Sequence, residues 1–242
     1  MIGLQTELKI ANILKNIAEG EKQIEVTRQV LAEQREFEPY TAFKRIDRFG
    51  NGYVTIMDVL EFLRQNEIPV LEADVKNLFK MYDSNNDGKL SYTDFLNLAL
   101  PRTSPSLRQL CTTRESYFVA KNDPLPYECE WALARVFDKE VNFTRKNELL
   151  KDDLQLRYDY SPLEAFRLID EERLGYLDLD SLYIFLKRNK IMTSESDILS
   201  LLRRTDKDGD GKLSYAEFVE AMSPIGQQPL TSSNLKRSAS HQ

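Results

Sequence analysis

A twelve-residue segment near the carboxyl end of the sequence places oxygen-bearing side chains at a spacing that suits a hard divalent cation. In segment 206–217, Asp206, Asp208 and Asp210 alternate along the chain, and Gly211 follows them. Calcium takes about six to eight oxygen ligands at about 2.3–2.6 Å, and glycine permits the sharp turn that brings alternate side chains together. The pattern predicts a calcium site with these ligands: Asp206, Asp208, Asp210, the Lys212 carbonyl, Ser214 through a water, and Glu217 with both carboxylate oxygens.

A second segment, 83–94, repeats this arrangement with one shorter acid. Its expected ligands are Asp83, Asn85, Asp87, the Lys89 carbonyl, Ser91 and Asp94. Asp94 is one methylene shorter than the glutamate that usually closes such a loop, so it favours contact through a single oxygen and a six-coordinate ion. We therefore expect weaker calcium binding here, with Mg²⁺ as a competitor.

Two incomplete versions of the same loop lie 36 residues before the complete ones, at 47–58 and 170–181. Phe49 replaces a central ligand in the first, and Leu174 replaces one in the second. Because each lacks a central oxygen, neither is expected to hold calcium tightly. Both keep the glycine of the turn and the apolar eighth position, which favours a structural role beside the complete loops.

These four loops belong to an internal duplication. A shift of 123 residues places 39–101 on 162–224 without a gap, with 23 identities in 63 positions, and extends more weakly into the segment before each copy. Apolar residues at helical spacing flank the loops, so we predict an all-α fold of two helix–loop–helix pairs with additional lead-in helices. The expected domains are a lead-in helix (1–38), a first pair (39–101), a linker (102–126), a second lead-in segment (127–160), a second pair (161–224) and a disordered tail (225–242).

The first lead-in segment carries Ile10, Ile17, Ile24 and Leu31 seven residues apart. This spacing predicts an amphipathic helix. Two interpretations are open for its apolar stripe: a coiled-coil or partner-docking helix, and a helix that packs on its own module.

The composition excludes several classes of function. The 242 residues carry a net charge of −6, which argues against nucleic acid as the main partner. No uninterrupted apolar run approaches about 18 residues, so no membrane insertion is expected. The only histidine in the sequence is His241, next to the last residue, which argues against catalytic mechanisms that need a buried imidazole. The sequence also lacks a phosphate-binding glycine loop and a nucleophile elbow, so we do not expect an enzyme. The two cysteines, Cys111 and Cys129, fit a reducing, cytoplasmic compartment.

These loops and their flanking helices resemble the EF-hand family, with four hands in two pairs. The resemblance implies calcium binding and a short antiparallel contact within each pair, here Val54 with Leu90 and Leu177 with Leu213. Each copy of the repeat consists of a lead-in helix, an incomplete hand and a complete hand. This arrangement, together with the sequence of segment 156–162, is also similar to ciliary and flagellar EF-hand proteins of protists. That second resemblance implies a place in a ciliary axoneme and protein partners such as tubulin or other axonemal proteins.

Two functions remain in competition. The long segments outside the hands and the content of only five methionines favour a calcium-responsive structural component of an axoneme or microtubule assembly. The alternative is a soluble calcium sensor or regulatory subunit that opens a groove for a target helix. Simple calcium buffering is disfavoured, because two of the four loops are incomplete.

Overall fold

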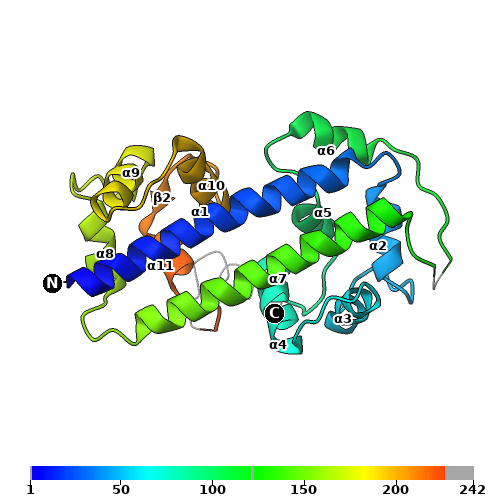
Figure 1. The fold of residues 1–242 in the computed structure, drawn as a ribbon, viewed down its shortest axis with the longest axis horizontal. Coiled ribbons are helices and arrows are strands. Elements are labelled where there is room, and N and C mark those ends of the chain that lie inside the picture. The colour runs from blue at the N-terminus through cyan, green and yellow to red at the C-terminus, as the bar shows by residue number, and fades with distance from the viewer. Residues whose placement is uncertain (1, 121–122, 227–242) are drawn as a thin grey trace, which may run out of the picture. The chain divides into compact units, whose positions relative to one another are not determined.

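The computed structural model describes residues 2–120 and 123–226, and these are mostly helical. The longest of the helices drawn in Figure 1 are α1 (Leu4–Glu33) and α7 (Tyr127–Gln155). The remaining elements are α2 (Pro39–Ile46), α3 (Ile56–Gln65), α4 (Glu72–Tyr82), α5 (Tyr92–Ala99), α6 (Pro105–Thr112), α8 (Pro162–Ile169), β1 (Tyr176–Leu177), α9 (Leu179–Arg188), α10 (Glu195–Thr205), β2 (Leu213–Ser214) and α11 (Tyr215–Met222). The predicted all-α class is confirmed.

The chain forms two compact units, and their boundaries differ from the expected ones. One unit, here called the N-unit, is Gln23–Arg145, and the other, the C-unit, combines Met1–Lys22 with Lys146–Gln242. The division passes through the middle of both α1 and α7. Each unit therefore contains one helix–loop–helix pair, the second part of the lead-in helix of its own copy, and the first part of the lead-in helix of the other copy.

In the N-unit, α2–α3 and α4–α5 flank the loops 47–58 and 83–94. Val54 and Leu90 join the two loops in an antiparallel bridge, with both N···O distances at 2.9 Å. One apolar core combines residues of these helices with the end of α1 and the start of α7. The ring of Phe62 lies edge-on to that of Phe137 on α7, with centroids 5.8 Å apart.

The segment 102–126 is expected to be a linker, but its described residues pack within the N-unit. It contains α6, whose Cys111 is fully buried, and Leu125 is also in the core. Arg114 donates hydrogen bonds to the carbonyls of Ala32 and Gln34. These contacts give the segment a fixed position, which its proline-rich composition did not indicate.

In the C-unit, α8–α9 and α10–α11 flank the loops 170–181 and 206–217. The loops pair through β1 and β2, which are antiparallel with Leu177 opposite Leu213. Phe166 of α8 lies edge-on to both Tyr215 and Phe218 of α11, with centroid distances of 5.3 and 5.6 Å. The pairing that the resemblance implied is therefore present in both units.

The apolar stripe of α1 is buried within the protein itself. Ile10, Ile17, Ile24 and Leu31 are all at most 2% exposed. The first two lie in the C-unit part of the helix and the last two in the N-unit part. Of the two interpretations of this stripe, the structure supports packing on the chain's own modules. The first part of α1 packs in the C-unit and the second part packs in the N-unit.

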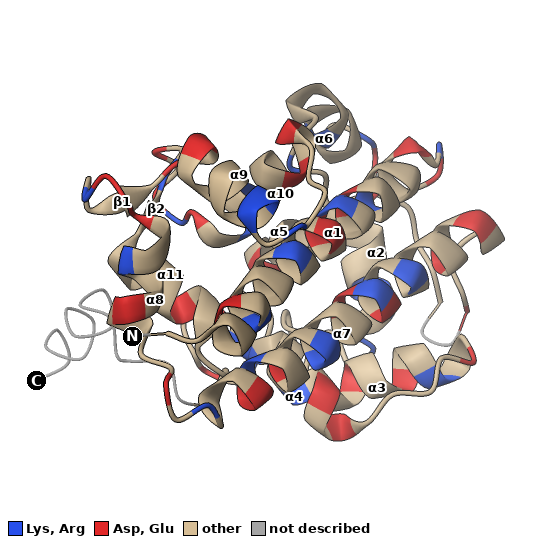
Figure 2. Ribbon diagram, turned by 60° about the vertical axis from the view of Figure 1, so that its left-hand side comes forward, with Lys and Arg blue, Asp and Glu red and all other residues tan. Residues whose placement is uncertain are grey.

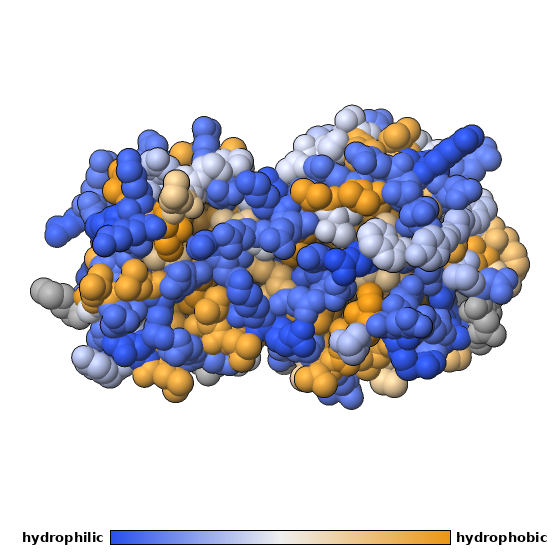
Figure 3. Space-filling view, viewed as in Figure 1, coloured by the Kyte–Doolittle hydropathy of each residue, from blue (hydrophilic) through white to orange (hydrophobic). Residues whose placement is uncertain are grey.

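No helix in the described part of the chain is long and apolar enough to span a membrane. Charged residues of both signs lie along α1 and α7 (Figure 2). On the face that Figure 3 shows, hydrophobic residues form small groups among hydrophilic ones. Of the predicted disordered tail, residues 227–242 lie outside the described residues.

Candidate metal-binding loops

The complete loop of the C-unit brings its three aspartates together. Ligand oxygens of Asp206, Asp208 and Asp210 all lie within 4.8 Å of one another. Asp206 is the C-cap of α10, and the loop then turns through Gly209 and Gly211, which have φ values of 76° and 79°. Both angles lie in the left-handed region that favours glycine. Amide groups of these glycines donate to the Asp206 carboxylate at 2.7 and 2.8 Å, which fixes its orientation.

The twelfth residue of this loop, Glu217, reaches across to the beginning of the loop. One carboxylate oxygen accepts the amide hydrogen of Lys207 at 2.7 Å, and the other accepts the amide and hydroxyl hydrogens of Ser214 at 2.9 and 2.7 Å. Burial opposes the charge on Glu217, but these donors outweigh it and lower the pKa of its carboxyl. Glu217 therefore stays ionised at the position from which a glutamate closes a calcium loop.

The carboxylates of this loop repel one another. The amide of Asp210 donates to Asp208 and favours its charged form, but burial and the nearby carboxylates of Asp210 and Glu217 outweigh this and raise the pKa of Asp208. A divalent cation among these oxygens would offset the repulsion, because its charge favours the ionised form of every neighbouring carboxylate. The donor set of hard oxygens suits Ca²⁺.

The loop lysines point away from the ligand oxygens. Lys212 places its ammonium 3.8 Å from the ring centroid of Tyr176, and Lys89 lies 3.9 Å from that of Tyr53. Each lysine is the seventh residue of its loop, and each tyrosine is the seventh residue of the paired incomplete loop. The ammonium groups are thus held on aromatic faces, and the lysines offer only their backbone carbonyls to an ion.

The complete loop of the N-unit has the same backbone arrangement. Asp83 is the C-cap of α4 and accepts the amide hydrogen of Gly88 at 2.7 Å, and Asp87 accepts that of Lys89 at 2.9 Å. The amide oxygen of Asn85 accepts from the Asp87 backbone at 3.1 Å. Ser91 begins α5 as its N-cap, in a capping box with Asp94.

The difference between the loops lies at the twelfth residue. One oxygen of Asp94 accepts from the Ser91 amide and hydroxyl at 2.9 and 2.7 Å, as Glu217 does with Ser214. The other oxygen of Asp94, Oδ1, is buried and has no hydrogen-bond partner, whereas the second oxygen of Glu217 bonds to the start of its loop. Burying an unpaired carboxylate oxygen is costly, so this atom favours the arrival of a cation. The twelve predicted ligands lie in two loops, six in each; their contact with an ion stays a prediction.

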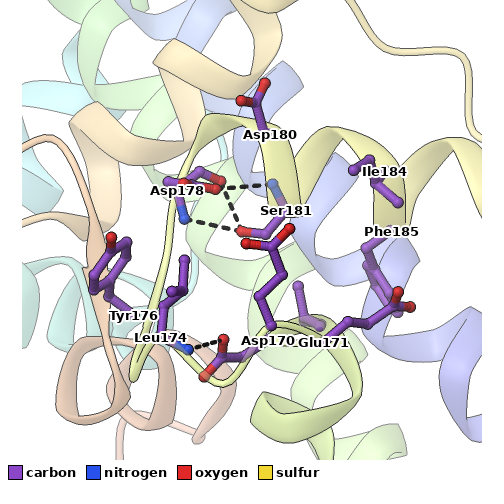
Figure 4. Close-up of a pocket in the computed structure, with 11 residues that line it drawn as sticks. Asp170, Glu171, Leu174, Tyr176, Asp178, Asp180, Ser181, Ile184 and Phe185 are labelled. Atoms are coloured by element: carbon purple, nitrogen blue, oxygen red, sulfur yellow. Dashed lines mark hydrogen bonds between the residues drawn. The ribbon is translucent and has the colours of Figure 1, made fainter.

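The two incomplete loops use their first aspartate to hold the backbone. Asp47 accepts from the amides of Asn51 and Gly52 at 2.9 and 2.8 Å, and Asp170 accepts from those of Leu174 and Gly175 at 2.8 and 2.9 Å. A cavity of about 150 Å³ lies beside the second of these loops (Figure 4). In that view the backbone amide of Asp178 donates to the Ser181 hydroxyl oxygen, and the amide of Ser181 donates to the Asp178 carboxylate, both at 2.9 Å, at the start of α9. These acids stabilise the loop and helix, which supports the structural interpretation.

The two cysteines are buried and their thiols are poor nucleophiles. Burial is the main cause that raises the pKa of Cys129 to about 11, and burial also raises the pKa of Cys111. Because the thiolate is the reactive form, both side chains act as small apolar groups at neutral pH.

The structure contains a set of buried charged residues beside the loops that the sequence pattern did not predict. Arg28 is fully buried and donates to Glu140 at 2.7 Å, and Glu21 is fully buried and pairs with Arg204 at 3.2 Å. In the sequences of α1, α7 and α10 these residues look like ordinary charges between apolar positions. The repeat offered one signal, because the 123-residue shift places Glu25 on Glu148, and both bind backbone amides.

Comparison with known proteins agrees with this geometry. The family description "EF-hand domain pair" matches residues 37–100 and 163–223, which together cover more than half of the chain. The chain is 24% identical over 181 residues to "Troponin C, isoform 2" of Caenorhabditis elegans, which covers 75% of this chain and 84% of that protein. It is 24% identical to "Troponin C, isoform 2A" of Homarus americanus over 75% of this chain and 89% of that protein. It is 26% identical to "Calglandulin" of Bothrops insularis over 62% of this chain and 88% of that protein.

Proposed function

The chain belongs to the EF-hand calcium-binding family, and from this premise we propose that it is a calcium-responsive structural component of a ciliary axoneme or another microtubule assembly. It performs no catalysis in this role. Ca²⁺ binds at loop 206–217 and, more weakly and in competition with Mg²⁺, at loop 83–94. Its partners are proteins, either tubulin or other axonemal proteins, and it acts in the cytoplasm or the cilium.

One observation carries the structural part of this proposal. A sensor of this family offers the apolar face of its paired hands to a target helix. In the N-unit that face packs against the chain's own helices, with Leu133, Val136, Phe137 and Val141 of α7 in the same core as the hands. These four residues are fully buried. An internal helix thus takes the place of an external target, which suits a fixed component better than a free sensor.

The surface that would meet a partner is marked by exposed aromatic residues. Tyr127 and Trp131 lie four residues apart on α7 and are 76% and 50% exposed, and Phe118 is 91% exposed. Large aromatic side chains dominate the energetics of protein interfaces. We expect these N-unit residues to contribute to the contact with neighbouring proteins.

The alternative is a soluble calcium sensor or regulatory subunit that binds a target helix. Its support is the similarity to proteins named troponin C across three quarters of the chain. For this function, calcium would have to release the internal helix from the hands before a target could bind. A calcium-dependent increase in binding to a hydrophobic resin would favour it.

Fractionation of detergent-extracted axonemes tests the proposal. The protein should sediment with axonemes in calcium and in chelator, and high salt should release it. A Trp131→Ala variant should sediment less completely, while Tyr183→Ala, which changes an aromatic residue of α9 in the C-unit, serves as a matched control. Recovery mostly in the soluble fraction under both conditions would contradict the structural function and favour the sensor.

A further inference from the structure

In the N-unit, the two helices that flank loop 83–94 are held by both long helices. Tyr82, the residue before the first ligand, ends α4 and donates its hydroxyl hydrogen to Glu140 of α7. Arg28 of α1 donates to the carbonyl of Leu98 near the end of α5 at 2.9 Å. Arg28 also donates to Glu140 at 2.7 Å and to the Tyr82 hydroxyl at 2.9 Å. Arg28 and Glu140 are fully buried, so no solvent screens this network.

In the C-unit, the helices that flank loop 206–217 are also held by the long helices. Glu21 of α1 accepts from Arg204 at 3.2 Å, two residues before the first ligand, and Lys22 pairs with Asp197 at the start of α10 at 2.7 Å. After α11, the amide of Ile225 donates to Glu148 of α7 at 2.7 Å. The helix that enters this loop is thus held by α1, and the chain just after the helix that leaves it is held by α7.

The two sets of contacts correspond through the internal repeat. Glu25 and Glu148 are 123 residues apart, and so are Arg102 and Ile225, whose amides they bind at 2.8 and 2.7 Å. Glutamates at equivalent positions of the repeat therefore fix the chain just after the leaving helix in both copies. Its presence in both copies indicates that the contact belongs to the repeated design.

Both loops are thereby connected to the same two helices. On α1, Glu21 contacts the entering helix of the C-unit loop, and Glu25, one turn later, contacts the chain after the leaving helix of the N-unit loop. On α7, Glu140 contacts the entering helix of the N-unit loop, and Glu148, about two turns later, contacts the chain after the leaving helix of the C-unit loop.

We propose that ion binding at loop 83–94 and at loop 206–217 is thermodynamically linked through α1 and α7. The proposal rests on the metal binding proposed above. An ion in either loop fixes its entering and leaving helices, and through the buried contacts it also orders the long helices that the other loop uses. The second ion then has less ordering to impose, so the linkage is positive. By reciprocity, each ion tightens the binding of the other by the same factor.

Calcium titration of the full chain tests this linkage, with the amide signals of Gly88 and Gly211 followed separately by NMR. These amides bond to Asp83 and Asp206 and therefore report on each loop. Glu217→Gln should abolish the Gly211 response, and it should weaken calcium binding at loop 83–94 about fivefold or more, the lower end of usual coupling. In a Glu21→Gln background, adding Glu217→Gln should change the affinity of loop 83–94 by a smaller factor, because, of the contacts described above, only those of Lys22 and Glu148 then connect the C-unit loop to α1 and α7.

Two further variants keep the result decisive. Glu140→Gln weakens the corresponding contact on α7 and should also reduce the linkage, which covers the case in which Glu21→Gln does not fold. Glu19→Gln, an exposed neighbour on α1 that pairs only with Lys15 among the ion pairs described, should leave the linkage intact. Equal affinity of loop 83–94 with and without Glu217→Gln would overturn the linkage. A fall of undiminished size in both the Glu21 and the Glu140 backgrounds would overturn the route through α1 and α7. If neither glycine responded to calcium, the proposed metal binding itself would fail.

Discussion

The two units follow one plan but differ in two ways that bear on calcium. In the C-unit, Glu217 bonds to the start of its loop, whereas Asp94 of the N-unit leaves a buried oxygen without a partner. In the N-unit, the fully buried Arg28 ties α1, α4, α5 and α7 together, whereas the corresponding Lys151 of the C-unit pairs with Glu148. From these contacts we expect the C-unit loop to bind calcium more tightly and the N-unit to be held by the more extensive buried network. On this view, one copy of the duplication is suited to binding and the other to holding structure.

The largest expected effect tests the buried network of the N-unit. Arg28→Met leaves the buried carboxylate of Glu140 without its cation, and breaking a buried ion pair in this way costs about 3–5 kcal/mol. Hydrogen exchange at the Val54 and Leu90 amides should report this loss of stability in the full chain. The matched variant Lys151→Met should cost less than half as much at the Leu177 and Leu213 amides. Equal losses would show that the two networks are equivalent.

Calcium should stabilise the C-unit more than the N-unit. At a concentration one hundred times Kd, an ion that binds only the folded state adds about 2.7 kcal/mol. At a concentration chosen for loop 206–217, hydrogen exchange at Leu213 should slow more than exchange at Leu90. Glu217→Gln should remove most of the effect at Leu213. A greater stabilisation at Leu90 would reverse the proposed order of the two sites.

Replacing the twelfth residue of either loop by that of the other loop should bring the calcium affinities of the two loops closer together. Asp94→Glu gives loop 83–94 a side chain long enough to reach the start of its loop, and Glu217→Asp removes that reach from loop 206–217. Within the range of EF-hand affinities, each change should shift the calcium Kd by about tenfold, in opposite directions, or about 1.4 kcal/mol each. Calorimetry with Ca²⁺ and then Mg²⁺ measures both shifts. Unchanged affinities would show that the unpaired oxygen of Asp94 is not the cause of the difference.

The sequence predicted local structure well because local chemistry determines it. The spacing of Asp206, Asp208, Asp210 and Gly211 requires a tight loop whatever surrounds it, and the apolar eighth positions pair as expected, Leu177 with Leu213. The family and the all-α class followed from these features.

The division into units could not be predicted in the same way. Both copies have similar lead-in helices, so each hand pair has two acceptable partners, and composition does not choose between them. The observed choice depends on contacts between distant residues, such as Phe62 with Phe137 and Arg45 with Glu130. The buried Cys111 and Leu125 likewise reveal packing of a segment whose prolines indicated a linker.

The smallest expected effect concerns pH and the N-unit contact of Glu25. Burial opposes the charge of Glu25, but the Thr103 hydroxyl and amide, Arg28 and the Arg102 amide outweigh it and lower its pKa. Because the folded-state pKa lies below the unfolded one, this stabilisation is complete above the ordinary value of 4.5 and is lost as pH falls through the folded pKa. The urea midpoint of the N-unit should therefore drop between pH 6 and pH 3, and Glu25→Gln should make that drop smaller. Glu19→Gln, at an exposed position of the same helix, serves as the control. If Glu25→Gln and Glu19→Gln gave the same pH profile, Glu25 would not hold the Arg102 segment through its charge, and the buried network of the N-unit would depend on Arg28 alone.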